Sequence, residues 1–209
     1  PYKPIVMLEG VCTKEEWSDV FSHGLDVIFH DFWQVGSFLA HKKKNTMPAI
    51  NAWIKIDTGM HRLGFKPEEV PAIYERLYAC EWIAKPIGLM THFACADEMD
   101  NPMTQNQMNL FKETIQSVLT YSDAKFSDAP IKISLANSGG ILAWPESYSN
   151  QLGAYTAELN YIRPGIMLYG ISPFSNKIGT DLGLKPVMTL QSHIIAIKTC
   201  KKGESVGYG

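Results

Sequence analysis

Short apolar runs alternate along the chain with stretches in which apolar residues recur at helical spacing. This alternation is typical of β-α units around a parallel sheet. Because the runs are apolar throughout, we expect both faces of the sheet to be buried, as in an α/β barrel or an open doubly wound sheet. Periodicity does not separate these two folds. Six strands are predicted, over Ile5 to Leu8, Asp26 to Phe29, Ala52 to Ile56, Ile87 to Thr91, Ile131 to Ala136 and Tyr161 to Leu168.

Four helices are predicted between the strands. The first begins at Thr13 to Glu16, where the Thr13 hydroxyl and the Glu16 side chain could form a capping box, and it ends at Gly24. The others are expected over about Trp33 to Lys42, from near Pro67 and from about Pro102. Each has one apolar face, so we expect these helices to pack against the sheet.

The pattern changes after Pro173. A loop with two glycines is followed by Val187 to Thr199, whose alternation predicts an antiparallel strand. We therefore expect an α/β domain over residues 1–178, and a linker with the start of a β-domain over residues 179–209.

Composition adds little that is unusual. The 209 residues, 45% hydrophobic and 19% charged, suit one sizeable globular domain or one domain and the start of another. A net charge of −2 and a pI near 6.3 give no basic face for a phosphate backbone, so nucleic acid is not an expected partner.

The cysteines and the apolar runs bear on the compartment. Four widely spaced cysteines contain no C-x-x-C pair, which predicts neither a zinc site nor a disulfide framework and fits a reducing cytoplasm. No run approaches the roughly 20 apolar residues that span a bilayer, so no membrane segment is predicted.

Polar residues gather where the predicted strands end, and in α/β barrels the loops after the strands surround one pocket. The first group is Asp57-Thr58-Gly59-Met60-His61-Arg62-Leu63-Gly64, which follows Lys55. Arg62 and Lys55 supply two cations suited to a carboxylate or a phosphate. The alternative is a salt-bridged loop in which Lys55 pairs with an acid.

The second group is Thr91-His92-Phe93-Ala94-Cys95-Ala96-Asp97-Glu98. As metal ligands, His92, Cys95 and Asp97 would mix soft and hard donors without a recognised spacing, so no metal is predicted. A neutral His92 imidazole beside a planar cofactor, or a buried histidine bonded to backbone, is favoured instead.

The third group, Leu135 to Gly140, can present the Ser138 hydroxyl and free amides to a phosphate, although Ser138 could equally cap a helix. The fourth group, Tyr161 to Gly170, places Arg163 in an apolar segment, where its charge needs a fixed acceptor. That acceptor is either a buried acid or an atom of a bound cofactor. Gly165 lets a ligand approach the backbone closely.

Taken together, these four segments in this order resemble the alanine racemase family of fold-type III pyridoxal 5'-phosphate enzymes. The likeness runs from Pro4 to Gly209. It implies a partial TIM-like (β/α)8 barrel, strands 3 to 8, followed by the first strand of a C-terminal β-domain. It also implies a cytoplasmic homodimer with active sites shared between subunits, which interconverts L-alanine and D-alanine and supplies D-alanine for the peptidoglycan of the cell wall.

The resemblance gives each residue of the cofactor site an implied role. Arg163 is similar to the arginine that donates to the pyridine nitrogen and keeps it unprotonated, which limits transamination. Ser138, with the backbone of Gly165 and Ile166, is similar to the phosphate cradle. His92 is similar to the histidine beside the cofactor ring that supports the arginine.

The resemblance also implies how substrate and protons are handled. Arg62 is similar to the arginine that positions the substrate carboxylate, and Lys55 to a lysine that many members carbamylate, an unmodified lysine being the alternative. Tyr208, in Gly203-Glu204-Ser205-Val206-Gly207-Tyr208-Gly209, is similar to the catalytic tyrosine that acts in the partner subunit's site. An ordinary strand tyrosine is the alternative for Tyr208.

The family's cofactor lysine belongs to a K-A-N-A-Y-G segment that is not found in these 209 residues. Six predicted strands against the family's eight lead to the same expectation, that the chain is part of a longer protein and is inactive by itself. Competing interpretations are a serine or broad-specificity racemase, a decarboxylase of the same barrel type, and a non-catalytic cofactor-binding module. The Asp57 to Gly64 segment and the extension from Val187 to Gly209 favour the racemase, and Tyr208 counts against the non-catalytic module.

Overall fold

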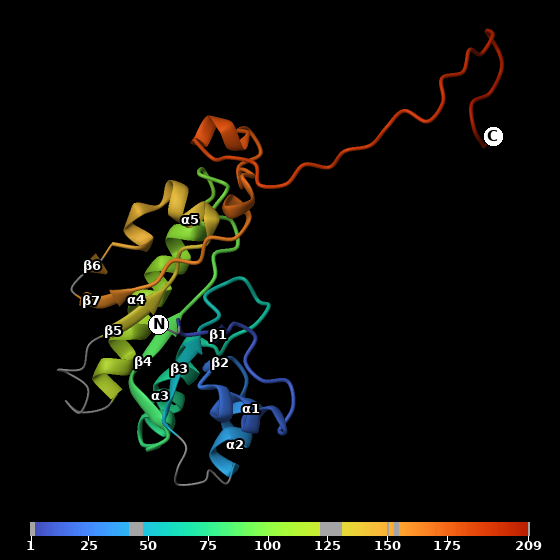
Figure 1. Cartoon of the computed structure of the whole chain (residues 1–209). Coiled ribbons are helices and arrows are strands. Elements are labelled where there is room, and N and C mark those ends of the chain that lie inside the picture. Colours follow the sequence, from blue (N-terminus) through green and yellow to red (C-terminus); the bar gives the residue numbers. More distant parts are fainter. Residues whose placement is uncertain (1–2, 42–47, 122–130, 150, 153–154, 209) are drawn as a thin grey trace.

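The computed structural model describes residues 3–41, 48–121, 131–149, 151–152 and 155–208. Six of its strands form a parallel sheet in the order β1-β2-β3-β4-β5-β7, and β6 pairs antiparallel with β7 at the end (Figure 1). The strands are β1 Val6–Met7, β2 Asp26–Phe29, β3 Ile50–Lys55, β4 Ile83–Met90, β5 Ile131–Ser134, β6 Gln151–Leu152 and β7 Tyr155–Asn160.

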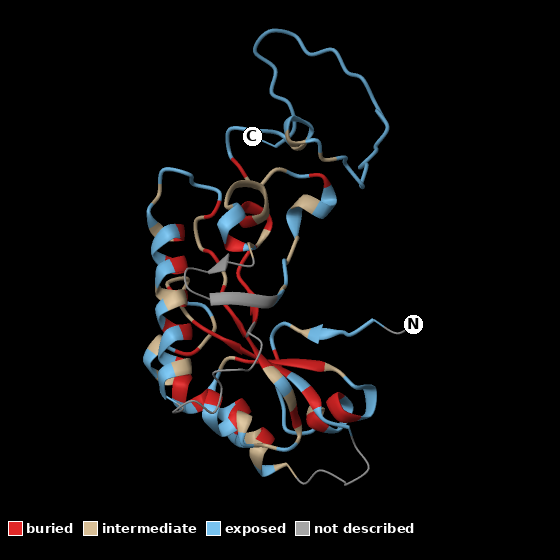
Figure 2. Cartoon of the chain, turned by 90° about the vertical axis from the view of Figure 1, so that its left-hand side faces the viewer, coloured by how far each residue is buried: buried red, intermediate tan, exposed pale blue. Residues whose placement is uncertain are grey.

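The helices lie between successive strands in sequence and turn their buried sides towards the sheet (Figure 2). The result is a parallel half-barrel of six strands with helices outside, which confirms the predicted barrel class. The α-helices are α1 Glu16–His23, α2 Phe32–Ala40, α3 Val70–Tyr78, α4 Met103–Tyr121 and α5 Ser138–Ala143, and short 3-10 helices cover η1 Pro67–Glu69, η2 Pro145–Ser147, η3 Ile166–Tyr169 and η4 Gly179–Leu182.

Period-two alternation along the strands divides their side chains between two faces. On β2, Val27 and Phe29 join the large apolar core that also contains buried helix residues, whereas Ile28 belongs to a second cluster with Trp53 and Met90. This second cluster lies on the inner face of the half-barrel. The alternation also explains why Lys55, at the end of β3, shares the inner face with Trp53.

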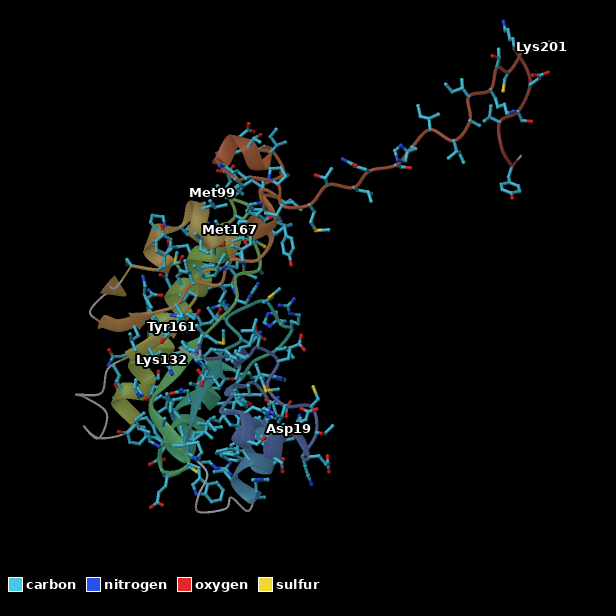
Figure 3. The ribbon with its side chains drawn as sticks, in the orientation of Figure 1. Asp19, Met99, Lys132, Tyr161, Met167 and Lys201 are labelled. Carbon is cyan, nitrogen blue, oxygen red and sulfur yellow. The ribbon has the colours of Figure 1, made fainter. Side chains whose placement is uncertain are left out.

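The inner face has a specific close contact between β3 and β4. A Cβ atom on Gly88 would lie 2.2 Å from the Trp53 ring, so only glycine leaves room for the indole. The Lys132 ammonium lies 4.7 Å from the centre of the Trp53 ring, and the Tyr161 ring meets the same indole edge-on at 5.1 Å. Figure 3 shows Lys132 and Tyr161 in this part of the sheet. Burial lowers the pKa of Lys132, and the nearby Asp26 carboxylate opposes that shift.

Helix α1 ends as predicted and begins differently. Gly24 adopts left-handed backbone angles, φ 61° and ψ 43°, and its amide donates to the Val20 carbonyl. The capping-box prediction is wrong, because the N-cap is Glu15 and no side chain caps the helix there. Instead, the Glu16 carboxylate reaches back and accepts from the Cys12 amide at 2.7 Å.

The sixth strand was predicted too late in the sequence. The strand is Tyr155–Asn160, and two backbone hydrogen bonds follow it, from the Tyr161 amide to the Ile133 carbonyl and from the Arg163 amide to the Ala136 carbonyl. Pro164 then has no amide to donate, and Gly165 precedes the 3-10 helix η3. The apolar residues that suggested a strand are exposed rather than buried: Ile162, Ile166 and Leu168.

The strand predicted over Val187 to Thr199 is also wrong. These residues belong to no strand, and Leu190, Ile194 and Ile195 are almost fully exposed. Figure 1 shows this C-terminal segment, in red, running away from the sheet. A strand needs a ladder of hydrogen bonds to a neighbouring strand, and in the described part of the chain this segment has only the bond from the Val187 amide to the Tyr169 carbonyl, at 3.4 Å. Separately, none of the helices in the described part of the chain is long and apolar enough to cross a membrane.

Candidate active site

Arg163 joins three strand ends at the carboxyl side of the sheet. Its Nη1 donates to the Ser134 hydroxyl at the end of β5. Its Nη2 donates to the carbonyls of Thr91, at 2.5 Å, and Leu135, at 3.1 Å. All these acceptors are neutral oxygens, and the structure gives Arg163 no carboxylate partner among the described residues. Burial lowers the pKa of Arg163 to about 10, so the guanidinium stays cationic at neutral pH.

Ser138 is held beside the segment that follows Arg163. Its buried hydroxyl accepts from the amides of Gly165, at 2.9 Å, and Met167, at 3.3 Å. The alternative that Ser138 caps a helix is wrong, because the N-cap of α5 is Asn137, whose side chain accepts from the Gly140 amide. The Asn137 residue takes the capping role, so the Ser138 hydroxyl is available to organise the loop.

The loop after β3 is organised by Asp57. One carboxylate oxygen accepts from the amides of Gly59 and His61, and the other lies 2.9 Å from His61 Nδ1. Burial opposes ionisation, but these hydrogen bonds outweigh it and lower the pKa of Asp57. The turn leaves Arg62 exposed beside the mouth of the half-barrel, where it is free to meet an anion.

Lys55 is buried at the end of β3, with only 8% of its surface exposed. In the described part of the chain no carboxylate lies within ion-pair distance of it, so the salt-bridged alternative is not observed. Burial, then the Arg62 and Arg163 guanidinium groups, lower its pKa, and the carboxylates of Asp57 and Glu9 oppose that shift. An ammonium in this position carries a charge that its surroundings do not neutralise.

His92 lies directly after β4 and is half-buried. Burial, followed by the positive charges of Arg163, Lys55 and Arg62, lowers its pKa to about 4. The imidazole is therefore neutral at physiological pH. The guanidinium groups of Arg62 and Arg163 lower the pKa of both His92 and Lys55, and Lys55 also acts on His92, so the four side chains share one electrostatic environment.

Two pockets meet at these residues. One, of about 240 Å³, is lined by His92, Ser138, Arg163, Gly165 and Ile166 together with neighbouring loop residues. The other, of about 770 Å³, opens between the carboxyl ends of the strands and includes Lys55, Arg62, His92, Arg163 and Gly165. His92, Arg163 and Gly165 line both pockets, so the two pockets are neighbours.

Two sequence-selected side chains, Tyr208 and Cys95, do not line these two pockets. Tyr208 is fully exposed on the extended C-terminal segment, which Figure 3 shows at Lys201, far from the sheet. Cys95 is half-buried near Asp97, and burial raises the pKa of its thiol, followed by the charges of Glu98 and Asp97. No cluster of three potential metal ligands occurs among the residues that the structure describes.

Three buried polar residues also belong to the site's surroundings, namely Thr58, Thr91 and Gln107. The sequence placed Thr58 and Thr91 in the first two polar groups without a role, and it gave no place to Gln107. The Gln107 amide contacts both loops that follow β3 and β4. A signal was present, since Gln107 precedes Met108 on the apolar face of α4, where a polar side chain requires hydrogen-bond partners.

Comparison with known proteins now identifies the family. Residues 1–173 match the model of the alanine racemase N-terminal domain. The chain belongs to the alanine racemase family. It is 44% identical over 205 residues to alanine racemase of Shewanella sediminis, covering 98% of this chain and 51% of that protein. It is 41% identical over 207 residues to that of Vibrio vulnificus, covering 99% and 51%.

Solved alanine racemases share the fold. The structure of alanine racemase from Acinetobacter baumannii superposes with a TM-score of 0.76 at 31% identity, over 98% of this chain and 51% of that one. The biosynthetic alanine racemase from Pseudomonas aeruginosa gives a TM-score of 0.69 at 34% identity, over 88% and 45%. The chain thus spans about half the length of the relatives that it matches.

Proposed function

We propose that the full-length protein carrying this chain is a pyridoxal 5'-phosphate-dependent alanine racemase. The observation that carries the proposal is Arg163, a cation held by three neutral oxygens in a pocket that it shares with a neutral His92. Its guanidinium is fixed, charged at neutral pH and without a carboxylate partner among the described residues. Such a group suits a ligand that offers a hydrogen-bond acceptor.

The residues present fit the cofactor. Ser138, Gly165 and Ile166 border the smaller pocket, and the Ser138 hydroxyl fixes the turn in which Gly165 approaches it. These residues would hold the phosphate, and Arg163 would donate to the pyridine nitrogen. When bound, the cofactor supplies an electron sink for the bond at Cα of the amino acid. An arginine does not release its proton to the ring, so it weakens that sink and limits transamination.

The cations at the wider pocket select the substrate. Arg62 is exposed at its rim and Lys55 is buried in its wall. Arg62 would bind the carboxylate of alanine through two parallel hydrogen bonds. Carbamylation of Lys55 would replace an unneutralised buried ammonium by an anion that can orient Arg62. The lowered pKa of Lys55 supports this, because only the neutral amine reacts with carbon dioxide.

Racemisation needs a base on each side of Cα. Tyr208 would hold and return the proton on one side, in the partner subunit's site, and its full exposure supports a role outside its own half-barrel. The lysine on the other side would come from the part of the full-length protein outside these 209 residues. The proposal thus includes a homodimer, a cytoplasmic location, a barrel domain over residues 1–178 and the start of a β-domain over residues 179–209.

The experiment incubates the purified full-length protein with pyridoxal phosphate and either L-alanine or L-serine, and follows the D-enantiomers by chiral chromatography. We expect D-alanine to form much faster than D-serine. Cofactor absorbance without turnover of either amino acid would contradict the proposal and indicate a non-catalytic cofactor-binding module. Faster formation of D-serine would overturn the assignment of alanine as the substrate.

A further inference from the structure

A chain of buried hydrogen bonds runs beneath the candidate active site and begins at Gln107 on α4. One Gln107 N–H donates to the Thr58 hydroxyl at 3.1 Å, and the Thr91 hydroxyl donates to the Ile56 carbonyl at 3.0 Å. The two threonine hydroxyls lie 2.7 Å apart. Because Thr91 has given its only hydroxyl hydrogen to Ile56, Thr58 is the donor between them.

The same amide fixes the loop after β4. Its other N–H donates to the His92 carbonyl at 3.0 Å, and its oxygen accepts from the Ala94 amide at 2.9 Å. Gln107 is fully buried, and both of its N–H groups and its oxygen are used. A glutamine is the residue that meets this demand, since it supplies two donors and one acceptor in one plane.

The loops that Gln107 joins carry the residues of the site. Thr58 lies in the turn that presents Arg62, and His92 lines both pockets. The Thr91 carbonyl accepts directly from Arg163, so the hydrogen-bond chain reaches the guanidinium. A shift of this loop would therefore move His92 and one acceptor of Arg163 together.

We infer that Gln107 is a positioning residue of the active site, whose buried amide sets the loops after β3 and β4 relative to Arg163. Only the expected loss of racemase activity rests on the proposed function. The positions of the two loops depend on hydrogen bonds to backbone groups, and they can be tested by hydrogen exchange without measuring enzyme activity.

The test uses the full-length enzyme with a Gln107→Leu substitution. We expect faster hydrogen exchange in peptides covering residues 57–64 and 91–96, weaker pyridoxal phosphate binding, and a loss in kcat/KM for alanine of about tenfold or more. Gln116→Leu is the matched control, because Gln116 lies on the exposed side of α4 and bonds only to Thr120 among the described residues. It should change each quantity by less than about twofold.

A second control separates positioning from stability. Ile115→Ala removes a buried side chain from the same helix without touching the network, and it should lower thermal stability while leaving loop exchange and kcat/KM near parent values. If it reproduced the losses of Gln107→Leu, or if Gln107→Leu left the exchange of both loops unchanged, the inference would be overturned.

Thr58→Val provides an independent variant if Gln107→Leu does not fold. It keeps the shape of the side chain and removes the hydroxyl link, so it should speed exchange in residues 57–64 and 91–96. Unchanged exchange in this variant would count against the inference. If the parent enzyme did not racemise alanine, the proposed function would be wrong. The hydrogen-exchange measurements would still decide whether Gln107 positions the two loops.

Discussion

At the scale of single residues, the position of Arg163 decides what the site can hold. Its guanidinium donates hydrogen bonds to oxygens of Ser134, Thr91 and Leu135, none of which is anionic. A partly buried cation without a carboxylate partner carries a desolvation cost, so such an arrangement is typical of a functional site rather than of a packing contact.

Arg163→Glu should increase transamination relative to racemisation in the full-length enzyme. A glutamic acid can share a proton with the pyridine nitrogen, which strengthens the electron sink that arginine weakens. The ratio is obtained by measuring pyruvate and D-alanine from the same reaction. Arg163→Lys, which keeps the charge, should change the ratio less. An unchanged ratio in Arg163→Glu would contradict the role given to Arg163.

His92 should make the protein less stable in acid. Its pKa is about 4 in the folded protein against 6.5 for an ordinary histidine, so the unfolded chain takes up this proton first as the pH falls. The stabilisation is therefore full above pH 6.5 and is lost progressively as the pH falls towards 4. His92→Gln should reduce the slope of unfolding free energy against pH in this window, measured by urea denaturation. Equal slopes for parent and variant would show that His92 does not titrate in this way.

At the scale of helices and strands, two glycines should respond oppositely to alanine. Gly88→Ala places a Cβ atom 2.2 Å from the Trp53 ring and should lower the free energy of unfolding by about 1–3 kcal/mol. At Gly36, in α2, an added Cβ atom would have no neighbour within 4 Å, so Gly36→Ala should raise the free energy of unfolding by about 0.5–1 kcal/mol. Both are measured by urea denaturation. A neutral Gly88→Ala would contradict the close packing of β3 against β4.

The same scale shows what the sequence could predict. Asp26–Phe29 was predicted with the bounds of β2, because three of its four residues are apolar and apolarity reports burial; all four are buried. Tyr161 to Leu168 was misplaced for the converse reason: Ile162, Ile166 and Leu168 are apolar yet exposed. The strand expected over Val187 to Thr199 failed because alternation cannot show whether a neighbouring strand exists.

The candidate site was predictable wherever a residue follows a strand. His92 and Ser138 lie in such positions, Lys55 is the last residue of β3, and the parallel sheet brings these strand ends together. Arg163 was expected inside the strand over Tyr161 to Leu168, and it lies instead in the segment that follows β7. Gln107 was not predictable in this way, because it reaches the site from a helix 15 residues after His92 and its role depends on tertiary contacts.

At the scale of the whole molecule, the proposed function connects Tyr208 with a second subunit. It is fully exposed on a segment that leaves the half-barrel, and under the proposed function it serves the partner's site. Tyr208→Phe should lower kcat for racemisation by a factor of about 100 or more, since general acid-base groups contribute on this order. Binding of pyridoxal phosphate, measured by absorbance, should stay unchanged. Racemisation at the parent rate would remove Tyr208 from the catalytic residues.

The central claim is that this half-barrel holds a site where the proton at Cα of alanine is removed and returned. The most direct measurement follows L-alanine with the full-length protein and pyridoxal phosphate in deuterium oxide, by chiral separation and mass spectrometry. The account predicts D-alanine that carries deuterium at Cα, approaching equal amounts of both enantiomers. L-alanine that binds but keeps both its configuration and its Cα hydrogen would contradict the account.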